Sequence, residues 1–233
     1  MQLVILAAGR GLRMRELTEH LPKPMLQVLG ENLLEHKIKA LPPSITEVIF
    51  VTGYKSEVIR EHFGKSWGGK NISYAFQSEL RGTGDSLHKA KHLLGERFLV
   101  CMGDDLYSPA DFENCLKYPW ALLAKETTET LNGAKIILDD LGRLKEIVEA
   151  VELKAGDFNN AGLYTLGREI FEYPLVALPN GEFGLPQTIA KVAKDFEIKV
   201  VESKGWHQIS SPEDLERVEK MFGDRKDRKP TAC

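Results

Sequence analysis

Apolar runs alternate with helical patterns through the first half of the chain. Four continuous apolar runs, typical of buried strands, occupy residues 2–8, 46–53, 71–77 and 97–105. Between these runs, apolar residues recur with the period of an amphipathic helix at residues 32–41, 56–63 and 85–94. Strands that alternate with helices predict right-handed βαβ units and a parallel sheet with helices on both faces.

The pattern changes in the second half, where strands predominate. Residues 133–150 are typical of a β-hairpin, because two strand patterns flank the turn Asp140-Leu141-Gly142. A further helix is predicted at residues 185–195. Further strands are predicted at residues 120–126, 159–167, 196–203 and 205–209.

A closing helix is predicted to begin at Pro212, with Ser211 as its N-cap and Asp214 completing a capping box. The chain has no internal repeat and no long linker, so we expect the second half to extend the same sheet. The pattern therefore predicts an α/β fold: a Rossmann-like, doubly wound, mostly parallel mixed sheet with an inserted β-hairpin region. We expect a single domain over residues 1–223 and a charged, disordered tail over residues 224–233.

Composition narrows the functional classes. The chain has 233 residues and a formal net charge of -3, which argues against a nucleic-acid-binding protein. The apolar run at residues 3–8 is too short for a signal peptide or a membrane span. The three cysteines, Cys101, Cys115 and Cys233, form no CxxC pair, which favours a reducing, cytoplasmic setting.

Polar features follow three of the predicted strands. They are the glycine turn after Ala8, the side chain of Gln77, and the turn Gly103-Asp104-Asp105. Open α/β sheets bind ligands outside the carboxyl ends of their strands. We therefore expect these three features to meet at one edge of the sheet.

The glycine turn alone is weak evidence for a nucleotide. The Gly9-Arg10-Gly11 turn follows a strand, but Met14 stands where a dinucleotide fingerprint requires its third glycine. An ordinary tight turn explains these two glycines equally well.

The longer stretch through Pro24 favours a polyphosphate site. Backbone N–H groups around Gly9 and Gly11 can approach an anion, and Arg13 can bind two phosphate oxygens at once. Lys23 adds a point charge on a backbone that its two flanking prolines restrict. A solvated basic loop is the alternative interpretation.

The stretch "LAAGRGLRMRELTEHLPKPM" resembles the signature of the sugar-1-phosphate nucleotidyltransferases, which reads GxGxR, a Leu-Thr pair and a Pro-Lys-Pro-like turn. Later segments resemble further motifs of that family in the same order. They are "QSELRGTGDSL", "MGDDLY", "NNAGLY" and "GWHQISSPEDL". The resemblance covers residues 3–222.

The resemblance implies the nucleotide-diphospho-sugar transferase fold and an enzyme that joins a nucleoside triphosphate to a sugar 1-phosphate, releasing pyrophosphate. Mg²⁺ is the metal expected with this chemistry. The attacking phosphate oxygen is already anionic, so no general base is required. Neither a nucleic acid nor a membrane is an expected partner, and the number of subunits is left open, a homo-oligomer included.

The resemblance also implies roles for residues of the first half. Arg13 and Lys23 would hold the triphosphate and stabilise the departing pyrophosphate. Gln77 would read the base edge, and its amide, which offers a donor and an acceptor, suits uracil or thymine and so favours UTP or dTTP. The remaining nucleotide-binding positions implied are Ala8, Gly9, Gly11, Gly82 and Thr83.

Asp104 would bind the metal, although a strand-end aspartate is also a common turn former. Asp105 and Gln208 are further candidate ligands, and Gln208 stands where many members carry a second Asp or Asn. The sugar-binding positions implied by the resemblance are Gly133, Glu149 and Asn160.

Two departures from the family pattern leave an alternative open. Ala150 replaces a lysine that many members carry after the sugar-binding glutamate, and Gln208 is a poorer magnesium ligand than a carboxylate. Intact Arg13, Lys23 and Asp104 favour an active enzyme acting on a hexose 1-phosphate of the glucose or N-acetylhexosamine type. The alternative is a non-catalytic relative that binds nucleotide sugars and regulates or scaffolds another protein.

Overall fold

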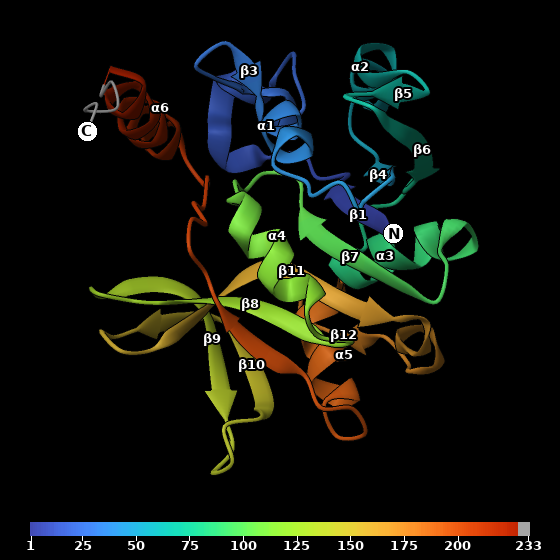
Figure 1. Ribbon diagram of the computed structural model, residues 1–233, viewed down its shortest axis with the longest axis vertical. Coiled ribbons are helices and arrows are strands. Elements are labelled where there is room, and N and C mark those ends of the chain that lie inside the picture. The colour runs from blue at the N-terminus through green and yellow to red at the C-terminus, as the bar shows by residue number, and fades with distance from the viewer. Residues whose placement is uncertain (228–233) are drawn as a thin grey trace.

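A single mixed sheet of ten strands forms the centre of the protein, whose computed structural model describes residues 1–227 (Figure 1). Its main path runs β10-β9-β11-β7-β1-β4-β6-β5, and β8 joins β11 to β14. The ten strands are β1 (Gln2–Ala7), β4 (Glu47–Thr52), β5 (Ser66–Trp67), β6 (Lys70–Phe76), β7 (Arg97–Met102), β8 (Ala121–Glu126), β9 (Leu131–Leu138), β10 (Leu144–Leu153), β11 (Phe158–Gly167) and β14 (Lys199–Glu202).

The first half of the chain builds the parallel part of this sheet. β1 lies between β4 and β7 and runs parallel to both, and β6 runs parallel to β4. The second half adds β11 antiparallel to β7, and β9 and β10 pair as the predicted hairpin. The α/β fold and the extension of one sheet by the second half are confirmed.

Helices cover both faces of the sheet, and two separate apolar clusters fill the space between the layers. On β1, Leu3 and Ile5 face a cluster that includes residues of α1, α2 and α4, whereas Val4 faces a cluster with α3 and α5. The α-helices are α1 (Leu33–Lys39), α2 (Ser56–Phe63), α3 (Gly82–Ala90), α4 (Pro109–Leu116), α5 (Leu185–Val192) and α6 (Pro212–Asp227).

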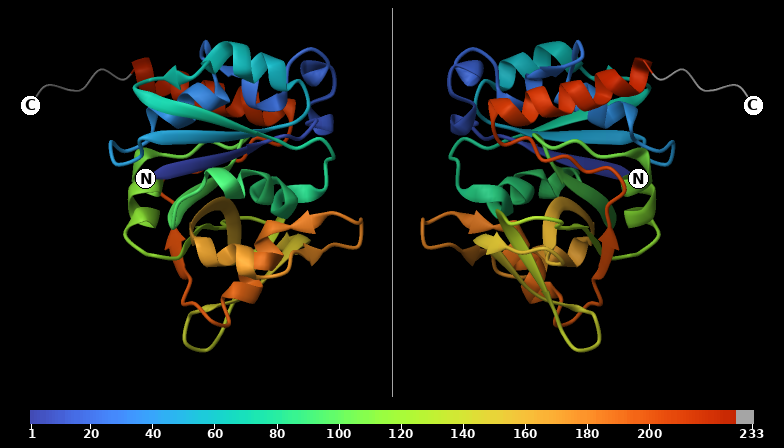
Figure 2. Two further views of the ribbon diagram at one scale, coloured as in Figure 1. Left: turned by 90° about the vertical axis from the view of Figure 1, so that its right-hand side faces the viewer. Right: turned by 90° about the vertical axis from the view of Figure 1, so that its left-hand side faces the viewer.

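Short elements complete the structure. Two pairs of two-residue strands are β2 (Gln27–Val28) with β3 (Glu31–Asn32) and β12 (Val176–Ala177) with β13 (Phe183–Gly184). The 3-10 helices are η1 (Leu12–Thr18), η2 (Lys23–Met25), η3 (Lys91–Leu93) and η4 (Arg168–Glu172). The loop after β1 and the β12–β13 hairpin lie on the same side of the molecule, in its upper and lower halves respectively (Figure 2).

Two predictions about the C-terminal part need correction. Residues 205–209 do not form a strand and contribute only an isolated bridge between His207 and Leu106. The closing helix α6 begins at Pro212 as predicted but continues through Asp227, so the expected boundary at residue 223 falls inside it. Residues 228–233 of the predicted tail lie outside the described residues.

A third apolar cluster joins the two ends of the chain. It buries Met14 of η1 and Val218 of α6 together with Leu106 and Ile209. The segment that follows β1 therefore rests on the segment that closes the fold. Among residues 1–227, the helices lack the length and apolar character needed to traverse a lipid bilayer.

Candidate active site

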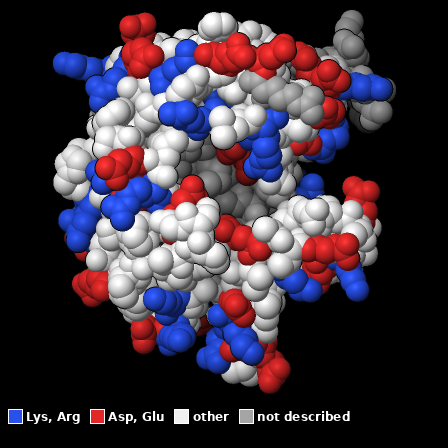
Figure 3. All heavy atoms as spheres, turned by 180° about the vertical axis from the view of Figure 1, so that it is seen from behind, with Lys and Arg blue, Asp and Glu red and all other residues white. Residues whose placement is uncertain are grey.

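A cleft of about 580 Å³ opens beside the carboxyl ends of β1, β6 and β7. From behind, the surface is hollowed near its centre, and both basic and acidic side chains border the hollow (Figure 3). Most of the predicted site residues line this cleft. They are Ala8, Gly9, Gly11, Arg13, Lys23, Gln77, Gly82, Thr83, Asp104 and Glu149.

The loop after β1 is shaped by Gly11, whose φ of +65° lies in the left-handed region. A Cβ atom there would lie only 2.8 Å from the Cβ of Lys23, so the close approach also requires glycine. The hydroxyl of Thr18 donates to the carbonyl of Gly11 over 3.2 Å. The two ends of η1 are therefore tied together beside Lys23.

Lys23 is the best-defined cation of the cleft. The residue is 5% exposed, begins η2 and is flanked by Pro22 and Pro24. Its Nζ atom lies 2.6 Å from Oδ2 of Asp104, at the end of β7. The two predicted catalytic residues therefore form an ion pair.

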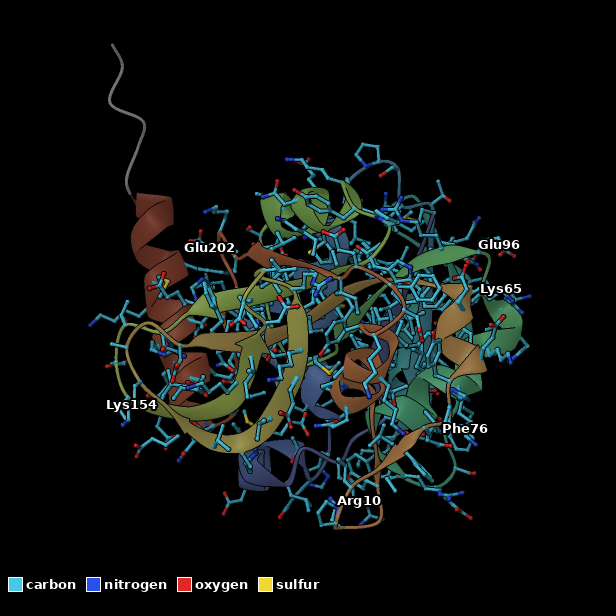
Figure 4. All side chains as sticks on the ribbon, turned by 90° about the horizontal axis from the view of Figure 1, so that it is seen from below. Arg10, Lys65, Phe76, Glu96, Lys154 and Glu202 are labelled. Carbon is cyan, nitrogen blue, oxygen red and sulfur yellow. The ribbon has the colours of Figure 1, made fainter. Side chains whose placement is uncertain are left out.

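The two arginines of the loop lie nearer the solvent. Arg13 and Arg10 both line the cleft and both are exposed. The guanidinium of Arg10 lies 5.9 Å from the ring centre of Tyr54, whose hydroxyl donates to the carbonyl of Thr18 over 3.0 Å. Figure 4 shows Arg10 at the rim of the molecule, on the side where the β12–β13 hairpin projects. Sequence analysis assigned no role to Arg10.

Asp105 does not line the cleft, because its carboxyl group is buried against the closing segment. Its Oδ2 accepts from Nε1 of Trp206 over 3.0 Å, and its Oδ1 accepts from the backbone N–H of Ile209 over 3.4 Å. Burial, followed by the charge of Asp104, raises the pKa of Asp105 to about 7. Both oxygens are engaged in joining the β7 turn to residues 206–209.

A fully buried lysine contacts the turn after β7 that contains Asp104 and Asp105. Lys37 of α1 is 0% exposed, and its ammonium donates to the backbone carbonyl of Asp105. Burial lowers the pKa of Lys37, while the charges of Asp105 and Asp104 oppose that shift. Sequence analysis did not identify Lys37, because a lysine inside an amphipathic pattern normally marks the solvent face of a helix.

Gln208 is exposed and does not line the cleft. It nevertheless lies next to the site in the fold, because His207 and Leu106 exchange two backbone hydrogen bonds of 2.9 and 3.0 Å. Asp105 holds the residues on either side of this bridge. The closing motif is thus anchored to the β7 turn that carries Asp104.

The donor set around Asp104 fits a magnesium ion that arrives with its substrate. No cluster of three or more His, Cys, Asp or Glu side chains within residues 1–227 could hold a metal by itself. Mg²⁺ commonly uses one or two carboxylates, retains water and takes its other ligands from substrate phosphates. Asp104, a cleft carboxylate beside the glycine loop after β1, fits that requirement.

Gln77 lies at the inner end of the cleft and is 2% exposed. Its side-chain amide is bonded inside the protein, to Gly82, Asp85 and Ser86. Gln77 lies at the strand end as predicted. Both the nitrogen and the oxygen of its amide, however, already have hydrogen-bond partners within the protein.

The backbone around position 82 requires a glycine. Gly82 has a φ of +90°, and a Cβ atom there would lie 2.5 Å from the backbone oxygen of Phe183. Thr83 accepts a hydrogen bond of 3.0 Å from the backbone N–H of Leu185. Both residues therefore dock the β12–β13 hairpin onto the start of α3, beside the cleft.

The hairpin supplies cleft residues that sequence analysis missed. Leu178, Glu182 and Phe183 all line the cleft. The turn Pro179-Asn180-Gly181 was a usable signal, because a tight hairpin loop of three residues favours glycine at its last position, and Gly181 has a φ of +83° there.

Of the three predicted sugar-binding residues, only Glu149 lines the cleft. It is exposed and precedes Ala150, whose φ of +56° coincides with a break in the β9–β10 register. Gly133 instead leaves room for the side chain of Asn159, whose Oδ1 atom would lie 2.7 Å from a Cβ at that position.

Asn160 is held on β11 close to the same region. Its Nδ2 atom donates to the hydroxyl of Tyr164 over 2.8 Å, and its Oδ1 accepts from the backbone N–H of Gly162 over 3.2 Å. The pKa of Tyr164 is raised chiefly by burial, and the charge of Glu149 adds to that shift. Asn160 therefore bonds to the buried Tyr164 and does not itself line the cleft.

Comparison with known proteins shows which family the sequence belongs to. The family model described as Nucleotidyl transferase matches residues 2–224. The chain is 30% identical to the UTP--glucose-1-phosphate uridylyltransferase AglF of Haloferax volcanii, over 95% of this chain and 96% of that protein. It is 31% identical to the bifunctional protein GlmU of Methanocaldococcus jannaschii, over 97% of this chain and 55% of that protein.

A third relative is the bifunctional sugar-1-phosphate nucleotidylyltransferase/acetyltransferase of Sulfurisphaera tokodaii, which is 30% identical over 96% of this chain and 56% of that protein. The chain thus spans about half the length of these bifunctional relatives. The match to the family model extends over nearly all of the described residues and includes every strand end of the cleft. The chain belongs to the nucleotidyl transferase family, as a member of its sugar-1-phosphate nucleotidyltransferases.

Proposed function

We propose that this nucleotidyltransferase joins a nucleoside triphosphate, UTP or dTTP, to a hexose 1-phosphate and releases pyrophosphate. An oxygen of the sugar phosphate attacks the α-phosphorus, and the bond from that phosphorus to the bridging oxygen of pyrophosphate breaks. The products are a nucleoside-diphosphate sugar and pyrophosphate. No proton transfer is required, because the attacking oxygen is already anionic at neutral pH.

One observation carries this proposal. A single cleft gathers two exposed arginines, a lysine held between prolines, and a carboxylate at a strand end, from three separate parts of the chain. A row of phosphate oxygens requires cations on several sides, and transfer at phosphorus depends mainly on alignment and charge neutralisation. A cleft with this set of charges suits a triphosphate better than a neutral ligand.

The roles of the charged residues follow from their positions. Arg13 lies at the open side of the cleft, where it would bind the outer phosphates and offset the charge that builds on departing pyrophosphate. Lys23 lies deeper, beside Asp104, where it would neutralise oxygens near the reacting phosphorus. The backbone around Gly9 and Gly11 would approach the phosphates closely.

Asp104 would hold Mg²⁺ together with phosphate oxygens of the substrate. When bound, the ion supplies Lewis-acid stabilisation of negative charge on the phosphates. Lys23 must then exchange its contact with Asp104 for a contact with phosphate. We propose Asp104 as the principal protein ligand, since both oxygens of Asp105 already accept hydrogen bonds.

The names of the relatives support the choice of substrates. AglF of Haloferax volcanii is named for UTP and glucose 1-phosphate, and it matches this chain over 96% of its length. We extend that chemistry to this chain, with glucose 1-phosphate or an N-acetylhexosamine 1-phosphate as acceptor. Glu149, the predicted sugar-binding residue that lines the cleft, would bind the sugar hydroxyls.

A pyrophosphate-release assay tests the proposal. The protein is incubated with each nucleoside triphosphate, Mg²⁺ and either glucose 1-phosphate or N-acetylglucosamine 1-phosphate. We expect pyrophosphate release that depends on both substrates and is greatest with UTP or dTTP. The Asp104→Asn variant, purified in the same way, controls for contaminating enzymes because it should release little.

A non-catalytic nucleotide-sugar-binding protein is the second candidate. It is favoured by Gln208, which is exposed and neutral at a position where the family resemblance leads us to expect a metal-binding Asp or Asn. In that case a UDP-sugar binds with measurable affinity, yet no pair of substrates releases pyrophosphate. Turnover with any pair excludes it.

A further inference from the structure

We infer that Asp85 and Ser86 are positioning residues that hold the Gln77 amide with only its oxygen available to the nucleotide. This arrangement selects a base that carries a ring N–H group, such as uracil or thymine, over cytosine. The inference rests on the proposed function for the identity of the ligand, a nucleoside triphosphate. It adds two residues of α3 to the determinants of base choice.

The Gln77 amide is fixed by contacts on both of its ends. Its Nε2 atom donates to Oδ2 of Asp85 over 2.9 Å and to the backbone carbonyl of Gly82 over 3.2 Å. Its Oε1 atom accepts from the hydroxyl of Ser86 over 2.6 Å. The first and third of these bonds are buried.

The carboxylate of Asp85 determines which way round the amide lies. A rotation that exchanges oxygen and nitrogen would set Oε1 against two acceptors, the Asp85 carboxylate and the Gly82 carbonyl. Asp85 is 7% exposed and Ser86 is 5% exposed, so water cannot readily compensate for this mismatch. Only the observed orientation satisfies every polar atom of the group.

A count of donors and acceptors then defines what the amide can offer to a ligand. A glutamine side chain has two N–H donors and an oxygen with two lone pairs. Asp85 and Gly82 occupy both donors, and Ser86 occupies one lone pair. One lone pair of the oxygen remains, so Gln77 presents an acceptor and no donor.

This acceptor distinguishes two nucleotides of equal size. The N3 position of uracil and thymine carries a hydrogen and can donate to the Gln77 oxygen, whereas N3 of cytosine is an acceptor. Cytosine at this position would set two lone pairs against each other inside a desolvated pocket. A site built to bond one partner rejects an analogue that leaves its polar group unpaired.

The arrangement depends on where α3 begins. The helix starts at Gly82, five residues after Gln77, so Asp85 in its first turn and Ser86 directly after it lie back against the end of β6. On the opposite side of Asp85, Nζ of Lys89 lies 3.5 Å from Oδ1 and is open to solvent. Lys89 contacts Asp85 but has no hydrogen bond to Gln77 within residues 1–227, and so provides a matched control.

Binding of UTP and of CTP in the presence of Mg²⁺, measured by calorimetry, tests the inference without requiring turnover. We expect the wild-type protein to bind UTP at least about tenfold more tightly than CTP, the effect of one unpaired buried polar group. In the Asp85→Asn/Ser86→Ala double variant only the Gly82 carbonyl still opposes rotation of the amide, so the UTP:CTP affinity ratio should fall towards one. The Lys89→Gln variant should retain the wild-type ratio.

The ratio is informative because loss of folded protein lowers both affinities equally. A wild-type ratio near one, or a ratio unchanged in the double variant, overturns the inference. The two proposals can fail separately. If the wild-type protein prefers UTP, the double variant loses that preference and no substrate pair releases pyrophosphate, then only the proposed function is rejected. If the double variant binds neither nucleotide, the Asp85→Asn single variant is measured in its place. A UTP:CTP affinity ratio of that variant equal to the wild-type ratio also overturns the inference.

Discussion

Lys23 and Asp104 form an ion pair of 2.6 Å between residues that are 81 positions apart in the chain. The lysine is 5% exposed, so its charge is neutralised inside the cleft by the residue that would bind the metal. If the proposed function holds, phosphate would become the new partner of Lys23 and Mg²⁺ the new partner of Asp104. Nucleotide binding would then have to break this ion pair.

Replacing Lys23 should reduce the rate of the chemical step. We expect Lys23→Ala to lower kcat by at least about tenfold, which corresponds to about 1.4 kcal/mol of transition-state stabilisation. Steady-state kinetics of pyrophosphate release measures the effect. Lys39→Ala, on the exposed side of α1, is the control and should leave kcat unchanged. An unaltered kcat in Lys23→Ala would remove this residue from the mechanism.

Glu149 should contribute to binding of the sugar 1-phosphate and not to binding of the nucleotide. We expect Glu149→Gln to raise the KM for the sugar 1-phosphate by about tenfold, the cost of a hydrogen bond to a charged group, while the KM for the nucleotide changes little. Glu152→Gln lies on the same strand, outside the cleft, and should leave both constants unchanged. A parallel rise in the nucleotide KM would contradict the assignment.

Gly82 should tolerate alanine poorly because of the backbone that faces it. The added Cβ would contact the Phe183 oxygen at 2.5 Å, whereas a Cβ at Gly181, with a similar φ of +83°, meets no atom within 4 Å. We expect Gly181→Ala to lower the free energy of unfolding by about 1 kcal/mol and Gly82→Ala by about 3 kcal/mol. Urea denaturation measures both, and equal losses would contradict the close approach of the hairpin.

His88 should make the folded protein less stable in mild acid. Among residues 1–227 its buried Nε2 atom has no hydrogen-bond partner, and its ring contacts Phe171. Burial lowers the pKa of His88 below its ordinary value. The unfolded chain therefore binds a proton more readily than the folded one, so the free energy of unfolding falls as pH drops through about 6.5.

The variant His88→Leu should lose this dependence. We expect the free energy of unfolding of the wild-type protein to fall relative to His88→Leu as pH is lowered from 8 towards 5. Urea denaturation at a series of pH values gives the comparison, and His92→Leu is a matched variant whose ring position is exposed. Parallel pH profiles for wild type and His88→Leu would refute the expectation.

The main elements could be predicted because local pattern and tertiary packing agree. Residues 56–63 have helical apolar periodicity and form α2 with the same bounds, since Ile59 and Phe63 pack under the sheet. The convergence of Ala8, Gln77 and Asp104 could also be predicted, because parallel neighbouring strands end at one edge. These inferences depend on periodicity and topology alone.

Long-range partners could not be predicted in the same way. Residues 205–209 have a strand-like composition, but the backbone N–H of Ile209 is satisfied by the Asp105 carboxylate and not by a neighbouring strand. The sequence likewise does not reveal that Asp85 and Ser86 engage the Gln77 amide. Such contacts depend on where a helix begins relative to a strand in space. Residue composition and local periodicity do not predict this relative position.

The cluster that buries Met14 with Val218 has a consequence for biosynthesis. A ribosome delivers the loop after β1 early, yet two buried members of the apolar cluster beneath that loop, Ile209 and Val218, come from the closing segment. Until then Met14 lacks Ile209 and Val218, and Asp105 lacks Trp206 and Ile209. The loop after β1 should therefore reach its full stability in a growing polypeptide only after the residues of α6 have been translated.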